Sequence, residues 1–317
     1  MKKYLYIILC AGLLALTGCV KDADIEPYRP ITGTDGRIIL TGYADAATRT
    51  GFGQASAEAI PLEWSAGDYI WADGSRSENL TAGGAKAAFI FNALQTAATY
   101  DIFYNMTGSD AGTALIPARQ TQHAAYAPEL GANGDFGFAT TGADGVFTLS
   151  HATSYVWFDL WTKDIDCNLA SISLSVSGGH TIAGEAVFAD EALGACTGSS
   201  SVTLSFGEKG VALPAESNES EVFAAMVLYP ADLAEATVSI VCTFTDGSVC
   251  LQTKAGKTLV PGGTLRISSQ LADADRKNSG IFYMTNEGVS QELPDESISY
   301  LKAVTLGDAA LSAETLI

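Results

Sequence analysis

Apolar and polar residues alternate with a period of two along most of the chain, and this pattern constrains the fold more than any other feature. In "SISLSVS" (171–177) the apolar residues Ile172, Leu174 and Val176 fall on one side and serines on the other. Successive side chains of a β-strand point to opposite faces, so the segment is typical of a half-buried antiparallel strand. The same pattern predicts strands at 37–43, 69–73, 87–93, 99–105, 156–161, 185–190, 201–206, 222–230, 237–244, 248–254 and 263–269.

Clusters of Gly, Asn, Asp and Ser separate these strands, and no segment sustains the 3.6-residue period of a helix. Many short strands with turns between them are typical of β-sandwiches, and a dozen exceed one sandwich of about seven strands. The sequence therefore predicts an all-β fold with two tandem antiparallel β-sandwich domains, residues 37–143 and 144–272. The loop at 131–145 is the best candidate for the join, and residues 273–317 form a C-terminal tail.

The N-terminus has the features of an export signal. Lys2 and Lys3 precede an apolar run that ends at Leu16, which is too short to span a bilayer. The run closes on "LTGC", which resembles a bacterial lipobox, so residues 1–18 are predicted to be a lipoprotein signal peptide and Cys19 to carry the lipid. The alternative is that Cys19 is an ordinary cysteine just beyond a general cleavage site.

Several acyl chains, palmitate among them, would anchor the mature chain stably to a membrane. Residues 19–36 would form the tether. The acidic "KDAD" (21–24) resembles a signal that sends lipoproteins to the outer face of the outer membrane. These features predict a surface-exposed protein held in the outer membrane by its lipid.

Net charge excludes one class of partner. The formal charge is −19, and loss of Lys2 and Lys3 with the signal takes it to −21. A surface of this sign repels phosphate backbones, so nucleic acid is excluded as a partner. The acids are spread along a chain with 47% hydrophobic residues, as in a folded protein.

Four cysteines remain after Cys10 and Cys19 are set aside: Cys167, Cys196, Cys242 and Cys250. A two-residue turn at 246–247 would place Cys242 and Cys250 on opposite faces of a hairpin and so disfavour a disulfide between them. Buried free thiols or one 167–196 bridge remain open.

Catalytic and metal-binding patterns do not occur. The three histidines, His123, His151 and His180, have neither metal-ligand spacing nor a nucleophile motif, and His151 in "FTLSHATSY" is interpreted as a hydrogen-bonded structural residue. The glycine-containing segments 83–89 and 255–259 lack the spacing of a phosphate-binding loop. The sequence predicts no enzyme, no cofactor and no bound metal ion.

A series of short motifs nevertheless follows a recognisable order. It consists of "ATRTGF" (47–52), "WSAGDYI" (64–70), "YDIFYN" (100–105), "LIPARQ" (115–120), "FTLSHATSYVWF" (147–158), "VLYP" (227–230) and "AGKTLVPGGTLRI" (255–267). Together with the lipobox, this series resembles the fimbrillin family of Bacteroidetes, the lipoprotein precursors of type V pili, over residues 37–268. The chain departs from the family at Asn105, where a proline is common, and in the tail 273–317.

The resemblance implies transthyretin-like sandwiches and assembly by strand exchange. An Arg-specific protease would cut the exported lipoprotein, with Arg49 the first candidate site and Arg37 the second. The cut would release the strand at 37–43 and leave a groove for a strand of the next subunit. A first strand held in the middle of its sheet, with neighbours on both sides, would contradict this expectation.

For the donor strand, "SISYLKAVTL" (297–306) is the candidate, with Ile298, Tyr300, Val304 and Leu306 on one face. An ordinary edge strand would show the same alternation. The implied partners are other pilus subunits, in a homo- or hetero-polymer, and a host or bacterial surface receptor.

One alternative function remains open. A surface lipoprotein of a nutrient-uptake system would bind glycans through exposed aromatic side chains, for which Trp71, Trp157 and Trp161 are the candidates. The glycan-binding function requires a tryptophan exposed to solvent, whereas the pilus function requires removal of the N-terminal strand.

Overall fold

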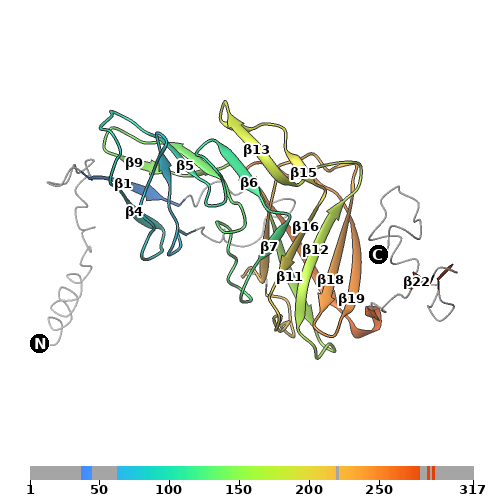
Figure 1. Ribbon diagram of the computed structural model, residues 1–317. Coiled ribbons are helices and arrows are strands. Elements are labelled where there is room, and N and C mark those ends of the chain that lie inside the picture. Colours follow the sequence, from blue (N-terminus) through green and yellow to red (C-terminus); the bar gives the residue numbers. More distant parts are fainter. Residues whose placement is uncertain (1–36, 45–62, 219–220, 279–283, 286–287, 290–317) are drawn as a thin grey trace, which may run out of the picture.

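The computed structural model describes residues 37–44, 63–218, 221–278, 284–285 and 288–289. Apart from a 3-10 turn at Asp273–Asp275, the regular structure of these residues is entirely β-strand, which confirms the all-β prediction. Each of the predicted strands occurs, with ends shifted by a few residues. The strands form two bodies, an N-terminal and a C-terminal sandwich (Figure 1).

The N-terminal sandwich is built from two sheets of short strands. The three-stranded sheet has the order β4 (Lys86–Phe91), β1 (Ile38–Tyr43) and β9 (Val146–Thr148). The five-stranded sheet has the order β10 (Ser150–His151), β8 (Gly137–Thr140), β5 (Asp101–Tyr104), β2 (Trp71–Ala72) and β3 (Ser75–Arg76). Trp64, Phe89 and Phe147 pack between the two sheets and form the centre of this core.

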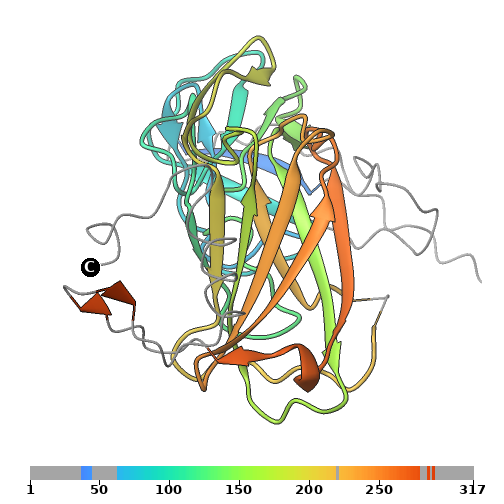
Figure 2. The same ribbon diagram turned by 90° about the vertical axis from the view of Figure 1, so that its right-hand side faces the viewer.

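The C-terminal sandwich has longer strands, which run side by side along its length (Figure 2). Its three-stranded sheet has the order β17 (Ala224–Leu228), β11 (Ser154–Thr162) and β20 (Thr264–Leu271). Its six-stranded sheet has the order β21 (Lys277–Asn278), β19 (Ser248–Ala255), β18 (Thr237–Phe244), β12 (Leu169–Val176), β16 (Ser201–Ser205) and β7 (Arg119–Thr121).

A smaller group of strands lies above the meeting point of the sandwiches in Figure 1. It comprises β14 (Ala192–Leu193), β13 (Ala183–Ala189), β15 (Thr197–Ser199) and β6 (Thr113–Ile116), which pairs with β13. Two further short strands, β22 (Met284–Thr285) and β23 (Gly288–Val289), pair with each other.

Three strand pairs are parallel, which the prediction of antiparallel sandwiches did not include. They are β1 with β9, β11 with β20 and β16 with β7. In each pair the two strands are far apart in the sequence. Such pairs arise from long connections rather than hairpins, and alternation along one segment cannot reveal them.

Strand β1 is an inner strand, and the expectation of a removable outer strand is wrong. It pairs with β4 over its whole length and with β9 at Thr41–Tyr43. Its side chains Ile38 and Leu40 are 2% and 0% exposed. The sequence did not indicate this position because β9 is only three residues long and follows β1 by more than a hundred residues. The position of β1 between β4 and β9 contradicts the exchange of a first strand from an open edge of the sheet.

The chain passes from one sandwich to the other more than once. Strands β5 and β8 are hydrogen-bonded neighbours in the N-terminal sandwich, yet the chain between them forms β6 and β7, which pair with β13 and β16. The loop expected at 131–145 contains β8. A boundary between residues 143 and 144 leaves β6 and β7 on the N-terminal side, although their partner strands lie beyond it.

Cys242 and Cys250 are directly opposite each other in the β18–β19 hairpin, so the prediction that they lie on opposite faces is wrong. The turn has one residue more than expected: Thr243 pairs with Val249, and Gly247, with a φ of +83°, donates to the carbonyl of Phe244. A shift of one residue moves a side chain to the other face. The four cysteines in the described residues are free thiols.

Candidate functional site

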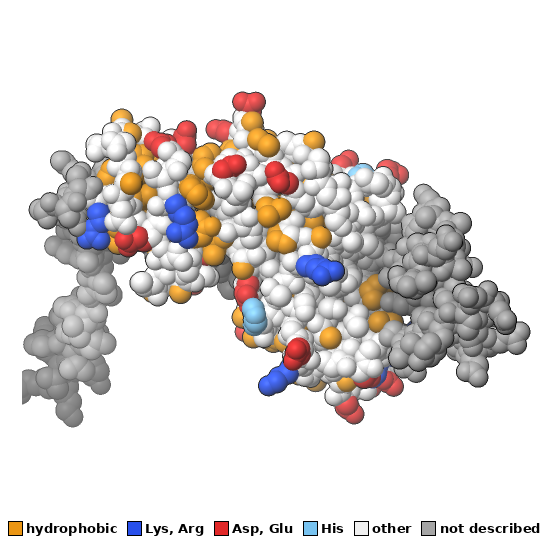
Figure 3. Space-filling model, in the orientation of Figure 1, with side chains coloured by type: hydrophobic (Ala, Val, Ile, Leu, Met, Phe, Trp, Pro, Cys, Tyr) orange, Lys and Arg blue, Asp and Glu red, His pale blue; other side chains and the backbone are white. Residues whose placement is uncertain are grey.

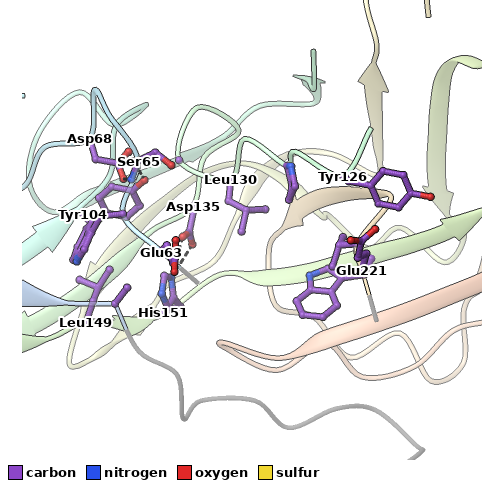
Figure 4. Close-up of a pocket in the computed structure, with 16 residues that line it drawn as sticks. Glu63, Ser65, Asp68, Tyr104, Tyr126, Leu130, Asp135, Leu149, His151 and Glu221 are labelled. Atoms are coloured by element: carbon purple, nitrogen blue, oxygen red, sulfur yellow. Dashed lines mark hydrogen bonds and ion pairs between the residues drawn. The ribbon is translucent and has the colours of Figure 1, made fainter. Parts of the chain in front are cut away.

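A cavity of about 440 Å³ lies where the two sandwiches meet (Figure 4). Its volume is within the range of about 300–1,000 Å³ that is usual for ligand-binding pockets, which often form between domains. Both sandwiches and the loop between β7 and β8 line it, with Ala44, Glu63, Trp64, Ser65, Asp68, Tyr104, Tyr126, Pro128, Leu130, Gly131, Asp135, Leu149, His151, Trp157, Glu221 and Val222.

A buried carboxylate, Asp135, organises one end of the cavity. It accepts hydrogen bonds from the hydroxyls of Thr153 at 2.6 Å and Tyr155 at 2.7 Å, and its Oδ2 lies 2.9 Å from Nδ1 of His151. Burial alone would raise the pKa of Asp135. The charge of His151 and the three hydrogen bonds outweigh burial and hold the pKa below its ordinary value.

A second carboxylate, Asp68, belongs to the N-terminal sandwich at the same end. Its Oδ2 accepts a hydrogen bond from the backbone N–H of Ser65 at 2.7 Å, and its Oδ1 accepts one from the hydroxyl of Tyr104 at 3.0 Å. Burial raises the pKa of Asp68 above its ordinary value despite these bonds. The two buried carboxylates therefore differ in the direction of their pKa shifts.

Aromatic side chains and an exposed carboxylate form the other end of the cavity, with Leu130 between the two ends (Figure 4). Trp157 is half-buried on β11, and Glu221 is exposed just before β17. Tyr126 is 39% exposed and has a φ of +61°, a conformation that non-glycine residues rarely adopt. Its ring packs edge-on against Phe223 at 5.7 Å, which holds it in place.

The Asp135 network is a set of buried hydrogen bonds around one carboxylate. Burial and the charge of Asp135 raise the pKa of Tyr155 well above its ordinary value, so the phenol stays protonated and keeps donating its hydrogen bond. The network joins the end of the β7–β8 loop to β10 and to the start of β11. It confirms that His151 is hydrogen-bonded, and the structural role of His151 stays an interpretation.

The sequence did not single out Asp135, although a signal was present. It is the lone acid in the glycine-rich segment 131–137 and directly precedes Phe136, which is fully buried. An acid that enters the core beside an aromatic residue needs hydrogen-bonding partners. Those partners come from residues 151–155, which no local pattern connects to it.

Most of the predicted functional residues lie outside the described residues. These are Cys19, Arg49, Ile298, Tyr300, Val304 and Leu306. Arg37 is described and is exposed immediately before β1. Of the candidate aromatic residues, Trp157 lines the cavity, Trp161 lies further along β11, and Trp71 lies on β2.

The described residues contain no group of three or more His, Cys, Asp and Glu side chains placed to hold a metal ion. In that same part of the chain, no helix is long and apolar enough to cross a membrane.

Comparisons with known proteins give structural likeness alone. No family model matches the sequence, and no curated protein matches it. A proposed cell adhesion protein of Bacteroides ovatus is 14% identical with a TM-score of 0.44, covering 75% of this chain and 94% of its own. A proposed cell adhesion protein of Bacteroides uniformis is 16% identical with a TM-score of 0.43, covering 77% and 96%.

A fimbrial protein of Bacteroides ovatus is 11% identical with a TM-score of 0.34, covering 86% of this chain and 60% of its own.

Proposed function

We propose that this protein is a structural or accessory subunit of a type V fimbria at the bacterial surface, where it supports adhesion. The observation that carries the proposal is the ordered motif series, and several of its members that the structure describes lie in a core or connect strands of the two sandwiches. In "WSAGDYI", Trp64 is 4% exposed and donates to the carbonyl of Gly42 on β1. The segment "LIPARQ" (115–120) joins β6 to β7, and "FTLSHATSYVWF" (147–158) runs from β9 into β11.

The proposed location follows from the N-terminal residues. Cys19 would carry the lipid, palmitate included, and residues 19–36 would tether the sandwiches to the outer face of the outer membrane. The partners of the protein would be other pilus subunits, of the same or another kind, and a surface receptor on a host or bacterium. In this role the protein builds structure and performs no catalysis.

Assembly by protease-triggered strand exchange is the finer part of the proposal, and the inner position of β1 limits it. Because β4 and β9 border β1 on both sides, exchange cannot begin at an open edge. Ile38 and Leu40 are also buried, and burial of such a side chain stabilises by about 1.5–3 kcal/mol. Exchange would therefore require a cut at Arg49 and then withdrawal of β1 by a competing strand, for which residues 297–306 are the candidate. In an uncut subunit, β1 would stay paired between β4 and β9.

Mass spectrometry of the native mature N-terminus tests this proposal. A mature chain that begins just after Arg49 supports processing and exchange, and the Arg49→Ala variant should then keep its lipidated N-terminus while Arg37→Ala, the matched control, is still cut. A surface protein that begins only at lipidated Cys19 excludes a polymerised stalk role and leaves an uncut anchor subunit. A chain that begins at Ile38 would retain β1 and contradict exchange of that strand.

A second function is favoured by one observation, the position of Trp157 in the wall of the cavity that Tyr126 and Glu221 also line. Aromatic faces and carboxylates are the groups that bind the apolar and hydroxyl faces of a sugar. In a glycan-array measurement, Trp157→Ala should abolish specific binding if this function holds. Trp161→Ala, on the same strand but outside the cavity, should leave the binding unchanged. Absence of specific binding by the unmodified protein would exclude this function.

A further inference from the structure

We propose that the two sandwiches form one folding unit, locked by the segment 113–122, in which the side-chain amides of Gln120 and Gln122 take the place of a missing strand. This inference concerns the mechanics of the chain and does not depend on the proposed function. It rests on three sets of contacts at the joint: the two amides, the β6–β13 pair and an aromatic cluster around Phe188.

The two glutamines bind the backbone of β17 as a neighbouring strand would. Gln120 donates from Nε2 to the carbonyl of Val227 at 2.7 Å, and its Oε1 accepts from the N–H of the same residue at 3.0 Å. Gln122 donates to the carbonyl of Phe223 at 2.9 Å and accepts from the N–H of Ala225 at 3.2 Å. Both side chains are buried, at 2% and 0% exposed.

This arrangement satisfies one edge of β17. On its other edge β17 pairs with β11. Without the glutamines, the buried N–H groups of Ala225 and Val227 would lose the side-chain oxygens that accept their hydrogen bonds. An unsatisfied buried polar group costs about 1–3 kcal/mol. A primary amide offers the same donor and acceptor as a peptide group, which explains why glutamine can take the place of a strand here.

The backbone that carries the glutamines is held from the other side as well. Strand β7 pairs in parallel with β16, and the N–H of Gln122 donates to the carbonyl of Ser205 at 3.0 Å. The segment is thus fixed between the two sheets of the C-terminal sandwich. Yet it belongs to the connection between β5 and β8, which are neighbours in the N-terminal sandwich.

The remaining contacts join the sandwiches through β13, whose residue Ala183 belongs to the C-terminal core. Strand β6 pairs with β13 over Gly184–Val187, and the adjoining residue Phe188 packs against the rings of Phe103 on β5 and Phe138 on β8, with centroid distances of 5.7 and 4.7 Å. Hydrophobic side chains follow the boundary between the two sandwiches on the face seen in Figure 3. Separation of the sandwiches would expose these rings to water and break the β6–β13 pairing.

Both ends of the 105–136 connection are anchored in one sandwich and its middle in the other. The C-terminal sandwich therefore cannot unfold without releasing the middle of the connection between β5 and β8. Domains joined only by a linker unfold in separate transitions, whereas a single unit unfolds in one. The lock itself contains no residue of β1.

Calorimetry and hydrogen exchange on the mature protein test the inference. We expect one unfolding transition, with a calorimetric enthalpy about equal to the van't Hoff enthalpy. Protection of β4 and β5 in the N-terminal sandwich should agree with that of β12 and β18 in the C-terminal sandwich to within about tenfold. Two separate transitions, or protection that differs by about a hundredfold or more, would overturn it.

The double variant Gln120→Met and Gln122→Met keeps the length of both side chains and removes their hydrogen bonds. We expect it to split the transition in two and to lower protection first in β6, β7 and β17. The matched control is Gln252→Met, which removes a bond of 2.6 Å to Ser269 inside the C-terminal sandwich and should lower a transition that stays single. A double variant that behaves like the control would overturn the role of the two amides.

Should the double variant fail to fold, Phe188→Ala gives an independent result. It removes only the aromatic contact between the sandwiches, from a side chain that is partly exposed. Separation of the two transitions in this variant supports the inference, whereas a single transition that is unchanged by the substitution would overturn the inference that these contacts lock the two sandwiches together.

Discussion

The two sandwiches reach similar architectures by different means. In the C-terminal sandwich β11 has nine residues, and β12, β18, β19 and β20 have eight each. Among the residues that the structure describes, no strand of the N-terminal sandwich exceeds six residues, and most have two to four. Long strands supply many ladder hydrogen bonds and a regular apolar face, whereas short strands supply few of either. The N-terminal sandwich must therefore be held together largely by its core side chains.

The composition of the two cores agrees with this difference. Trp64 is at the centre of the N-terminal core, edge-on to Phe89 at 4.9 Å, Tyr104 at 5.5 Å and Phe147 at 6.4 Å. Much of the C-terminal core consists of Ile, Leu and Val side chains from alternate positions of its long strands. A few large aromatic contacts stabilise one sandwich, and many small aliphatic contacts stabilise the other. Loss of one side chain should accordingly have a larger effect on the N-terminal sandwich.

The largest effect should come from Trp64→Ala, which removes the centre of the aromatic cluster. We expect it to lower the free energy of unfolding by about 3–5 kcal/mol, as is usual for removal of a buried aromatic side chain. Trp64→Phe keeps a ring but loses the hydrogen bond to Gly42, and should cost about 1 kcal/mol for the bond together with a smaller packing loss. Urea unfolding measures both. A Val238→Ala change in the C-terminal core that cost as much as Trp64→Ala would contradict the comparison.

The next effect should come from Asp135→Asn in the wall of the cavity, because removal of one partner from a buried ion pair leaves the other uncompensated. We expect a loss of about 3 kcal/mol at pH 7. Since the pKa of Asp135 is lowered on folding, its stabilisation is complete above the unfolded value of about 4 and is lost as the pH falls below it. The variant should show less acid destabilisation than the unmodified protein in unfolding measurements between about pH 5 and pH 2.

Asp68→Asn is the matched control, because the pKa of Asp68 is raised on folding. Protonation of Asp68 therefore favours the folded state as the pH falls through the raised value. The control should remove a gain in stability on acidification, the opposite sign to Asp135→Asn. If both variants changed the pH dependence in the same direction, the assignment of opposite environments to the two carboxylates would be wrong.

The same contrast explains which parts of the molecule could be predicted. Alternation in segments such as 171–177 and 237–244 predicts the long C-terminal strands well, because one face of each is buried along its whole length. Strands β6 to β9 have three or four residues, too few for a period of two to stand out. Their pairing depends on partners far away in the sequence. For this reason the inner position of β1 and the connection between the sandwiches were not predicted.

The candidate cavity could not be predicted for a related reason. Trp157 and Glu221 come from strand and loop residues of the C-terminal sandwich, whereas Asp68 and Tyr104 come from the N-terminal one. A local pattern indicates whether each of these side chains is buried or exposed. It does not indicate which side chains from the two sandwiches meet, because that depends on the path of the 105–136 connection.

A moderate effect is expected from Gly42→Ala, which tests how tightly β1 packs against the rings of Phe147 and Phe89. A Cβ atom at Gly42 would lie 2.5 Å from Cζ of Phe147 and 2.9 Å from Cε2 of Phe89, so the rings would have to move. Overpacking of this kind costs about 1–3 kcal/mol. The control Tyr43→Ala, at a side chain that is 36% exposed, should cost much less in thermal unfolding. Equal costs would mean that β1 is loosely held, which would favour its exchange.

The smallest perturbation is chemical labelling of the cysteines, and it reports on one sandwich only. The four cysteines of the described residues all lie beyond β11, and Cys242 and Cys250 are 1% and 2% exposed. Burial raises the pKa of Cys250 to about 11, so almost no reactive thiolate is present at pH 7.5. In a variant with Cys167→Ser and Cys196→Ser, lacking residues 1–19, we expect labelling of this pair only on unfolding.

Introduction of Trp64→Ala into that background connects labelling to the comparison between the two sandwiches. The tryptophan is far from both thiols in the sequence and belongs to the other core. If the sandwiches unfold together, the substitution should raise the labelling rate of Cys242 and Cys250 by the factor that its loss of stability implies, about tenfold for each 1.4 kcal/mol. If they unfold separately, the rate should stay unchanged while the N-terminal sandwich melts. Labelling thus shows whether Trp64→Ala lowers the stability of the N-terminal sandwich alone or of both sandwiches.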